Sequence, residues 1–353
     1  MADLKQLVEL SNRYGSNPDL VLAGGGNTSY KENGILYVKC SGTSLSTIDD
    51  SGFVAMDIGK MHELMDKEYP SSDSEREALY LKDVMDARCD EDMNKRPSVE
   101  ALLHSLFPQS FVLHIHPALV NGVTCAVNGE KLVREILGDK IIWIDICRPG
   151  YTLAKLCYKA MCDYYNQYGT SAKVILLQNH GIFFAGDTPE EIGELVEDTM
   201  EKLNKCLKRR SEESESLISA ITGKKVKYLP IREAAWFVEN EDNAMVLSKP
   251  FTPDHIVYCG PFMYFVRKNT MYSDLTKFKN THGDYPKVVL LEKTGIFAVV
   301  DDEHAIDNIA LLVNDAMKIA FYANKFSNVL PMTDELTDFI THWEAEAYRK
   351  KQA

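Results

Sequence analysis

The pattern of apolar and polar residues divides the chain into helices separated by short strands. Apolar residues recur at helical spacing over 3–14, 152–168 and 189–214. The strand-like runs are shorter, and the segments expected to form strands are 35–40, 111–116, 141–146 and 173–177. Strands that alternate with helices along the chain are typical of an α/β fold.

Two further helical stretches are expected before the strand over 111–116. Residues 59–94 are polar and carry helical patches, which is typical of surface helices. A helix is predicted over 97–107, with Ser98 as its N-terminal cap, because a serine hydroxyl there accepts a hydrogen bond from the first turn. The charged run over 208–215 is interpreted as the solvated end of a helix.

One segment of the chain occurs twice. Residues 173–187 read KVILLQNHGIFFAGD and residues 287–301 read KVVLLEKTGIFAVVD, with eight of fifteen positions identical. The similarity resumes in the helix that follows each copy, after a shift of three residues. Because the match continues from strand to helix, we favour duplication of a strand–turn–strand–helix unit over chance similarity. The second copy carries Thr294 where the first carries His180.

The length of 353 residues predicts two domains, since domains usually run to about 100–200 residues. We expect an N-terminal domain over 1–215 and a smaller α/β domain over 225–353, with the boundary near 222–225. The second domain would be a degenerate repeat of the first, without its metal ligands.

Composition and charge exclude several classes of protein. The chain has 52 acidic and 39 basic residues, a formal net charge of −13, whereas nucleic acids and anionic membranes need basic surface. No run of 18 apolar residues and no secretory segment is present, so no membrane span is expected. The eight scattered cysteines favour reduced thiols over a disulfide framework. We therefore expect a cytoplasmic protein.

Three histidines have the pattern of a metal site. His114 and His116 stand two apart in a predicted strand, so their side chains share one face. His180 follows another predicted strand, in a turn opened by Gly181. Two imidazoles from one strand and a third from a strand end suit Zn²⁺ with one position left open. Purely structural histidines remain the alternative, because a His-x-His pair alone is not specific.

Other polar residues could complete such a site. Glu100 lies in the predicted helix before the histidine strand, where it would be a metal ligand, a general base, or simply a carboxylate favoured by the helix dipole. His104 shares its helix face but has no further partner at ligand spacing. The segments 24–29 and 40–44 are predicted loops that could bind an anion or be plain turns. Neither has the spacing of a nucleotide-binding motif.

Together these motifs resemble the class II aldolase/adducin family. The matching segments are Gly25-Gly26-Asn27-Thr28-Ser29, Lys39-Cys40-Ser41-Gly42, Arg96-Pro97-Ser98-Val99-Glu100, His114-Ile115-His116-Pro117 and Asn179-His180-Gly181-Ile182. The similarity covers about 5–205 and is closest to the aldolase part of bifunctional rhamnulose-1-phosphate aldolase/alcohol dehydrogenases. The chain stops about where their dehydrogenase half would begin, so that half is expected to be absent.

The resemblance implies a three-layer α/β/α sandwich, in a homo-oligomer and usually a tetramer. It implies that His114, His116 and His180 hold Zn²⁺ and that Glu100 acts as acid and base. It also implies that a phosphate is held by the residues that match the family's phosphate loops, Asn27, Thr28, Ser41, Gly42 and Ser98. Val99 departs from the pattern, because many phosphate-binding members have a second serine there. No residue can be aligned with the family's tyrosine acid.

The activity implied is reversible cleavage of a ketose 1-phosphate, such as rhamnulose or fuculose 1-phosphate, to dihydroxyacetone phosphate and an aldehyde. The partner would then be a small sugar phosphate, and the metal Zn²⁺ or another divalent transition metal, since three imidazoles accept several. The alternatives are a sugar-phosphate 4-epimerase or dehydratase of the same family, or a non-catalytic adducin-like scaffold. With a net charge of −13, attraction of an anionic substrate must be local, from the metal, backbone donors and Lys39.

Overall fold

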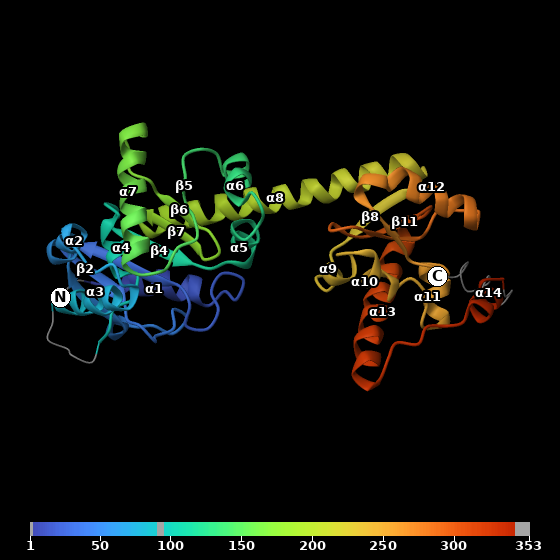
Figure 1. The fold of residues 1–353 in the computed structure, drawn as a ribbon, viewed down its shortest axis with the longest axis horizontal. Helices are drawn as coiled ribbons and strands as arrows, with labels where there is room; N and C mark the ends of the chain where they lie inside the picture. The colour runs from blue at the N-terminus through green and yellow to red at the C-terminus, as the bar shows by residue number, and fades with distance from the viewer. Residues whose placement is uncertain (1–2, 90–94, 343–353) are drawn as a thin grey trace. The chain divides into compact units, whose positions relative to one another are not determined.

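The computed structural model describes residues 3–89 and 95–342 (Figure 1). The chain divides into two compact units, Met1–Cys206 (unit 1) and Leu207–Ala353 (unit 2). The division falls inside helix α8 (Pro189–Thr222), so it lies earlier than the boundary expected near 222–225. The expected helix end over 208–215 is wrong, because the charged run lies within α8 and its charges form i,i+4 ion pairs along the helix surface.

Unit 1 is built on a seven-stranded sheet with the order β3-β2-β1-β4-β7-β6-β5. Its strands are β1 (Asn27–Glu32), β2 (Ile35–Lys39), β3 (Phe53–Asp57), β4 (Phe111–Ile115), β5 (Ile142–Ile144), β6 (Val174–Leu177) and β7 (Gly181–Gly186). All neighbours pair antiparallel except β5 and β6. The strand β4 is central, and its residue His114 pairs with Asn27 on one side and Phe183 on the other.

Helices cover both faces of this sheet. They are α1 (Lys5–Gly15), α2 (Ile58–Asp66), α3 (Asp73–Asp86), α4 (Ala101–Leu106), α5 (Ala118–Thr124), α6 (Gly129–Leu137) and α7 (Tyr151–Tyr168), with a 3-10 turn at Asp50–Gly52. Alternate residues of β4 point to opposite faces. Leu113 and Ile115 join the core under α1, α5, α6 and α8, whereas Val112 joins the core under α4 and α7. The predicted three-layer α/β/α sandwich is confirmed.

The segment before α4 differs from the sequence prediction. The helix begins at Ala101 rather than at residue 97, and its N-cap position is Glu100, which makes no side-chain capping bond. Residues 96–98 are instead extended beside the end of β2, where the Ser98 amide donates to the Lys39 carbonyl at 3.0 Å. Because this segment pairs with a strand, its backbone cannot be helical. Residues 90–94, at the end of the stretch predicted as surface helices, lie outside the described residues.

The expected loop over 24–29 is also partly wrong, because Asn27 to Ser29 form the start of β1. A strand places alternate side chains on opposite faces. Asn27 and Ser29 therefore face the α4 side, and Thr28 faces α1, where its hydroxyl bonds with that of Ser11 at 2.6 Å.

Unit 2 is a smaller α/β unit around a four-stranded sheet with the order β8-β11-β10-β9. Its strands are β8 (Lys225–Leu229), β9 (Tyr264–Val266), β10 (Val288–Leu291) and β11 (Gly295–Val300). Its helices are α9 (Ala234–Phe237), α10 (Glu241–Met245), α11 (Pro253–Cys259), α12 (Met271–His282), α13 (Ile306–Phe326) and α14 (Asp334–His342), with 3-10 turns at Lys268–Thr270 and Glu303–Ala305. Ile218 of α8 and Leu275 of α12 pack on one face of the sheet, and α13 packs on the other.

The two sheets share a pattern of pairing. The order β4-β7-β6-β5 in unit 1 matches β8-β11-β10-β9 in unit 2, and in each set only the last pair is parallel. The hairpins have the same register, with Leu177 opposite Gly181 and Leu291 opposite Gly295. We therefore propose that unit 2 is a degenerate copy of the central part of unit 1. In the described residues, no helix is both long and apolar enough to cross a membrane.

Candidate metal site

The site lies where β4 ends beside the turn between β6 and β7. His114 is in β4, His116 follows it, and His180 is the last residue of the turn. The turn is tight because Asn179 has a left-handed backbone with φ 56°. A Cβ at Gly181 would meet the His116 ring at 2.6 Å and the Ile115 carbonyl at 2.6 Å. Glycine is thus required for β7 to approach the end of β4 and the His116 ring beside it.

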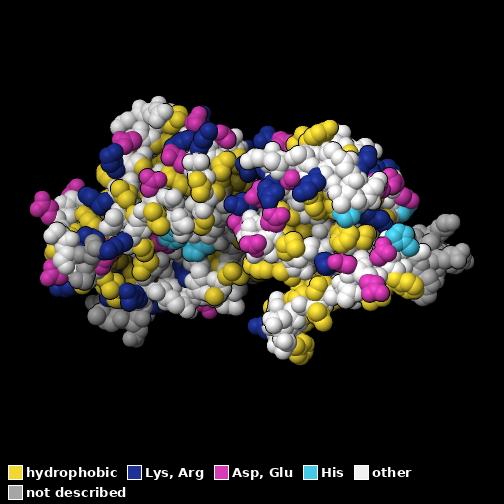
Figure 2. Space-filling view, turned by 45° about the vertical axis from the view of Figure 1, so that its right-hand side comes forward, with side chains coloured by type: hydrophobic (Ala, Val, Ile, Leu, Met, Phe, Trp, Pro, Cys, Tyr) yellow, Lys and Arg dark blue, Asp and Glu magenta, His cyan; other side chains and the backbone are white. Residues whose placement is uncertain are grey.

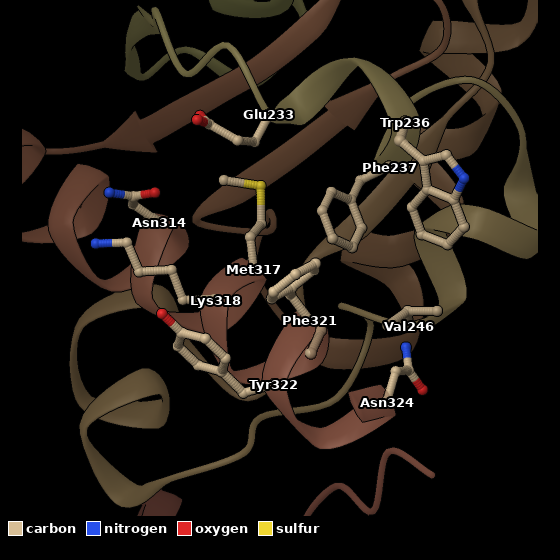
Figure 3. Close-up of a pocket in the computed structure, with 11 residues that line it drawn as sticks. Glu233, Trp236, Phe237, Val246, Asn314, Met317, Lys318, Phe321, Tyr322 and Asn324 are labelled. Atoms are coloured by element: carbon tan, nitrogen blue, oxygen red, sulfur yellow. The ribbon is translucent and has the colours of Figure 1, made fainter. Parts of the chain in front are cut away.

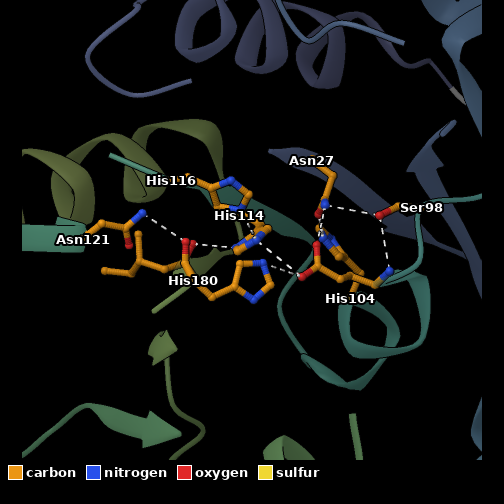
Figure 4. A network of polar contacts seen from close by, with 9 residues as sticks. Asn27, Ser98, His104, His114, His116, Asn121 and His180 are labelled. Atoms are coloured by element: carbon orange, nitrogen blue, oxygen red, sulfur yellow. Dashed lines mark hydrogen bonds and ion pairs between the residues drawn. The ribbon is translucent and has the colours of Figure 1, made fainter. Parts of the chain in front are cut away.

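The structure brings the three imidazoles together (Figure 4). One nitrogen from each of His114, His116 and His180 lies within 4.8 Å of the others. His114 is fully buried, while His116 and His180 are partly exposed, and histidine side chains reach the surface of unit 1 in the space-filling view (Figure 2). Within residues 3–89 and 95–342, this is the only group of three or more side chains that could hold a metal ion. It could therefore bind a metal that substrate can reach.

The protonation of two of these rings suits metal binding. Nδ1 of His114 lies 2.9 Å from the Ile182 carbonyl, which can only accept, so Nδ1 carries the hydrogen and the Nε2 lone pair faces the site. Burial, then the nearby His180, holds the pKa of His114 well below its usual value. Burial and the neighbouring imidazoles lower the pKa of His116 to about 4. Both rings are neutral near pH 7, and a neutral imidazole is the form that binds a metal.

Glu100 presents a carboxylate oxygen to the same point. Its Oε1 lies 3.4 Å from Nε2 of His114 and 3.3 Å from Nε2 of His180. This oxygen is buried and has no hydrogen-bond partner among the described residues. A buried oxygen in that state costs free energy, because it has lost water and gained no donor. The donor set of three imidazoles and an unpartnered carboxylate oxygen thus fits a divalent cation.

The other oxygen of Glu100 is held in place. Its Oε2 accepts from Nδ2 of Asn27 at 2.7 Å, and the same Nδ2 lies 3.2 Å from the Ser98 hydroxyl. The hydroxyl of Ser98 also accepts from the Glu100 amide at 3.3 Å. Asn27, Ser98 and Glu100 thus form one hydrogen-bonded network. Thr28 is not part of it, because its hydroxyl faces α1.

The expected anion loops lie beside this network. Ser41 and Gly42 are exposed, and the Ser41 amide donates to the Arg96 carbonyl at 2.7 Å, which ties this loop to the Ser98 segment. A pocket of about 220 Å³ is lined by Arg96, Ser98 and the half-exposed Val99. Lys39 is only 4% exposed, and its Nζ donates to the Gly24 carbonyl at 3.2 Å.

Sequence reasoning missed two residues that shape the site. His104 is fully buried, and its ring nitrogens contact Asn27 Oδ1 and Ser29 Oγ. Its spacing of four residues from Glu100 was the only signal in the sequence. Asn121 of α5 donates to the His180 carbonyl at 3.1 Å and so fixes the turn.

Comparison with known proteins identifies the family. The model of the family described as Class II Aldolase and Adducin N-terminal domain matches residues 5–205, more than half of the chain. The uncharacterized oxidoreductase YuxG of Bacillus subtilis (strain 168) is 30% identical over 197 residues, which are 53% of this chain and 27% of that protein. The chain thus matches well under two thirds of that relative's length.

Two solved structures are also similar. The N-terminal class II aldolase domain of a conserved protein from Thermoplasma acidophilum shares 27% identity at a TM-score of 0.49, over 58% of this chain and 94% of that one. L-fuculose-1-phosphate aldolase from Thermus thermophilus shares 13% identity at a TM-score of 0.38, over 59% of this chain and 97% of that one. Because the family model spans more than half of its residues, the chain belongs to the class II aldolase and adducin N-terminal domain family.

Proposed function

We propose that the protein is a metal-dependent aldolase that reversibly cleaves a ketose 1-phosphate to dihydroxyacetone phosphate and an aldehyde. The observation that carries this proposal is the convergence of three imidazoles on an unpartnered carboxylate oxygen of Glu100. Membership of the class II aldolase family supports the same reaction class. We also propose that the protein is cytoplasmic and forms a homo-oligomer. Light scattering of the purified protein would test the oligomeric state.

His114, His116 and His180 would hold Zn²⁺ or another divalent transition metal. When bound, such an ion supplies positive charge that stabilises the negative charge left on the substrate after carbon–carbon cleavage. The lowered pKa of His114 and of His116 favours this role, because a ring that binds no proton near pH 7 keeps its nitrogen lone pair available to a metal. Asn121 supports the turn that carries His180.

Glu100 would move the proton. In the condensation direction its carboxylate would remove a proton from the carbon next to the substrate carbonyl and become a carboxylic acid. In the cleavage direction that carboxylic acid would return a proton to the carbon that carries the developing negative charge and become a carboxylate again. Only Oε1 is free for this step, since Oε2 accepts from Asn27 at 2.7 Å. The direction of Oε1 towards the histidines therefore decides which substrate atom it reaches.

The phosphate would bind beside this group, at Asn27, Ser41, Gly42 and Ser98. Thr28 could contribute only through its backbone, because its hydroxyl is engaged by Ser11. The exposed Val99 provides no hydroxyl where many members of the family have one. Lys39 supplies a nearby positive charge instead, which suits a site on a chain of net charge −13.

The test is product analysis with rhamnulose 1-phosphate and fuculose 1-phosphate. We expect the metal-loaded protein to release an aldehyde and dihydroxyacetone phosphate, and chelation to abolish the release. Recovery of an epimer or a dehydrated sugar phosphate would assign one of the other reactions of the family. A metal-loaded protein that converts no sugar phosphate would contradict the proposal.

A further inference from the structure

We propose that His104 is a positioning residue. With its hydrogen on Nε2, it sets the orientation of the Asn27 amide, which in turn directs Oε1 of Glu100 towards the three histidines. The catalytic consequence rests on the function proposed above, whereas the direction of the hydrogen bonds does not.

The amide of Asn27 determines which nitrogen of His104 carries the hydrogen. Its Nδ2 donates to Glu100 Oε2 at 2.7 Å and is within 3.2 Å of the Ser98 hydroxyl (Figure 4). A carboxylate can only accept, so the NH₂ group must face Glu100. The carbonyl oxygen Oδ1 then faces the other way, against Nε2 of His104. Because Oδ1 can only accept, Nε2 must donate.

The hydrogen bond on the other side of the His104 ring runs in the same direction. Nδ1 of His104 lies 2.7 Å from the hydroxyl of Ser29, two residues beyond Asn27 on the same face of β1. With the hydrogen on Nε2, Nδ1 is an acceptor and the serine hydroxyl donates. The hydrogen bonds therefore run in one direction, from Ser29 through His104 and Asn27 to Glu100. Burial keeps the ring neutral, since it holds the pKa of His104 well below its usual value.

The ring cannot easily turn over. It is 0% exposed and lies edge-on to Phe183, with ring centroids 5.5 Å apart. A half-turn of the ring would exchange Nε2 with Cε1, so a C–H group would face Asn27 Oδ1 in place of the N–H donor. Packing therefore fixes the donor at the place where Asn27 needs one.

Loss of the donor would release Glu100. An asparagine amide has two orientations that differ little in shape, and a rotation by half a turn would place Oδ1 against Glu100 Oε2. Two oxygens repel, so the bond at 2.7 Å would break and the carboxylate would turn. Oε1 would no longer be held beside His114 and His180, which it now approaches to 3.4 and 3.3 Å.

Nitrogen NMR of the protein labelled at histidine tests the arrangement without any assay of activity. We expect the His104 signals, assigned by their loss in H104Q, to show a hydrogen on Nε2 and none on Nδ1. A His104 signal with its only hydrogen on Nδ1 would overturn the inference.

Two substitutions test the consequence for the reaction. The side-chain amide introduced by H104Q can still donate to Asn27, whereas H104L provides no donor. We expect H104L to lower kcat by about tenfold to a hundredfold, with little change in KM and an altered pH profile, because a displaced general acid or base loses most of its effect. We expect H104Q to recover most of kcat.

His62 provides a matched control. Its Nε2 bonds the Ser105 carbonyl at 3.0 Å, and it contacts neither Asn27 nor Glu100, so H62L should leave kcat unchanged. If H104L fails to fold, S29A provides a second test. It removes the hydroxyl that donates to Nδ1 of His104 and should lower kcat in the same way, though less. Equal losses in folded H104Q and H104L, or no loss in either, would contradict the inference. A wild-type protein inactive on every sugar phosphate would contradict the proposed function and leave the NMR result standing.

Discussion

The hairpin turns of the two units share a backbone and differ in their side chains. In unit 1, Asn179 has φ 56° and His180 follows it; in unit 2, Lys293 has φ 50° and Thr294 follows it. The next residue is glycine in both turns. A Cβ at Gly295 would meet the ring of Tyr228 at 2.5 Å, much as one at Gly181 would meet the histidine rings.

Tyr228 takes the place of His114 in unit 2. It pairs with Phe297 of β11, as His114 pairs with Phe183 of β7. Pro230 follows β8 where His116 follows β4, and the hydroxyl of Thr294 donates to a carbonyl of its own turn, that of Glu292, at 2.9 Å. The same backbone arrangement therefore occurs in both units. The two units differ at three positions, where unit 1 has the histidines of the candidate metal site and unit 2 has Tyr228, Pro230 and Thr294.

A second difference concerns the neighbouring strands. In unit 1, β1 pairs with β4 and brings Asn27 next to His114. In unit 2, β8 is the edge of its sheet, and the Tyr228 amide donates to the Glu215 carboxylate of α8 at 2.7 Å. The pocket of unit 2 is of another kind: about 470 Å³, with the apolar side chains of Trp236, Phe237 and Phe321 (Figure 3). The proposed acid/base group, Glu100, is thus held by Asn27 of a strand that has no counterpart beside β8 in unit 2.

The largest effect on metal binding is expected when His180 of the unit 1 turn is replaced by threonine, the residue at the matching position of unit 2. H180T removes one of three imidazole ligands, and we expect metal affinity to fall by about a hundredfold or more, with loss of activity. T294A in unit 2 is the control and should change neither quantity. Metal titration of the two variants makes the measurement, and an unaltered metal affinity in H180T would break the comparison.

Removal of the carboxylate should lower the reaction rate far more than it lowers metal binding, because the three imidazoles remain. E100Q keeps the shape of the side chain and its bond to Asn27 but cannot exchange a proton, so kcat should fall by about 10²- to 10⁴-fold. E215Q changes the carboxylate beside Tyr228 in unit 2 and should leave kcat near the wild-type value. Steady-state kinetics and the metal content of both variants make the measurement. An E100Q variant with the activity of the wild-type protein would refute the role given to Glu100.

The charge of Lys39 should matter only for an anionic substrate. K39M should raise KM for a ketose phosphate by about tenfold, the value of one charge-assisted hydrogen bond, and affect the unphosphorylated ketose little. Lys31 is a partly buried lysine on the neighbouring strand β1 that donates to the Gln109 carbonyl at 2.8 Å, so K31M is the matched control. Equal effects of K39M on both ketoses would show that Lys39 does not bind the phosphate.

The smallest effect concerns acid stability of the metal-free protein. His116 has a pKa of about 4 in the folded chain because burial disfavours its charged form, against about 6.5 when unfolded. Between these values the unfolded chain binds more protons, so stability should fall as the pH drops from 6.5 to 4. Thermal melts over this range should show a smaller fall for H116Q, which has no group to titrate. An identical fall in both proteins would argue against a buried neutral ring.

The sequence could predict those parts of the site that depend on local spacing. The separation of His114 and His116 by two residues in a strand placed both rings on one face, and the turn after the strand predicted over 173–177 added His180. The direction of the Thr28 side chain could not be predicted, because residues 27–29 were expected to form a loop, where alternation does not apply. As a strand they place Thr28 on the face opposite Asn27.

The remaining features depend on contacts between distant residues. Pairing of residues 96–98 with the end of β2 shortened the helix expected over 97–107 and left Glu100 just before α4. The partners of His104 are Asn27 and Ser29, more than seventy positions away, so no local pattern could reveal its role. The repeat predicted one hairpin of unit 2, but the order of its sheet follows from pairing that the sequence does not encode locally.

The metal content of the purified protein is the most direct test of the central claim, that only unit 1 carries a metal site. Elemental analysis should find one divalent transition metal ion per chain in the wild-type protein and in T294A, and almost none in H180T. Two ions per chain, or one ion retained in H180T, would contradict it.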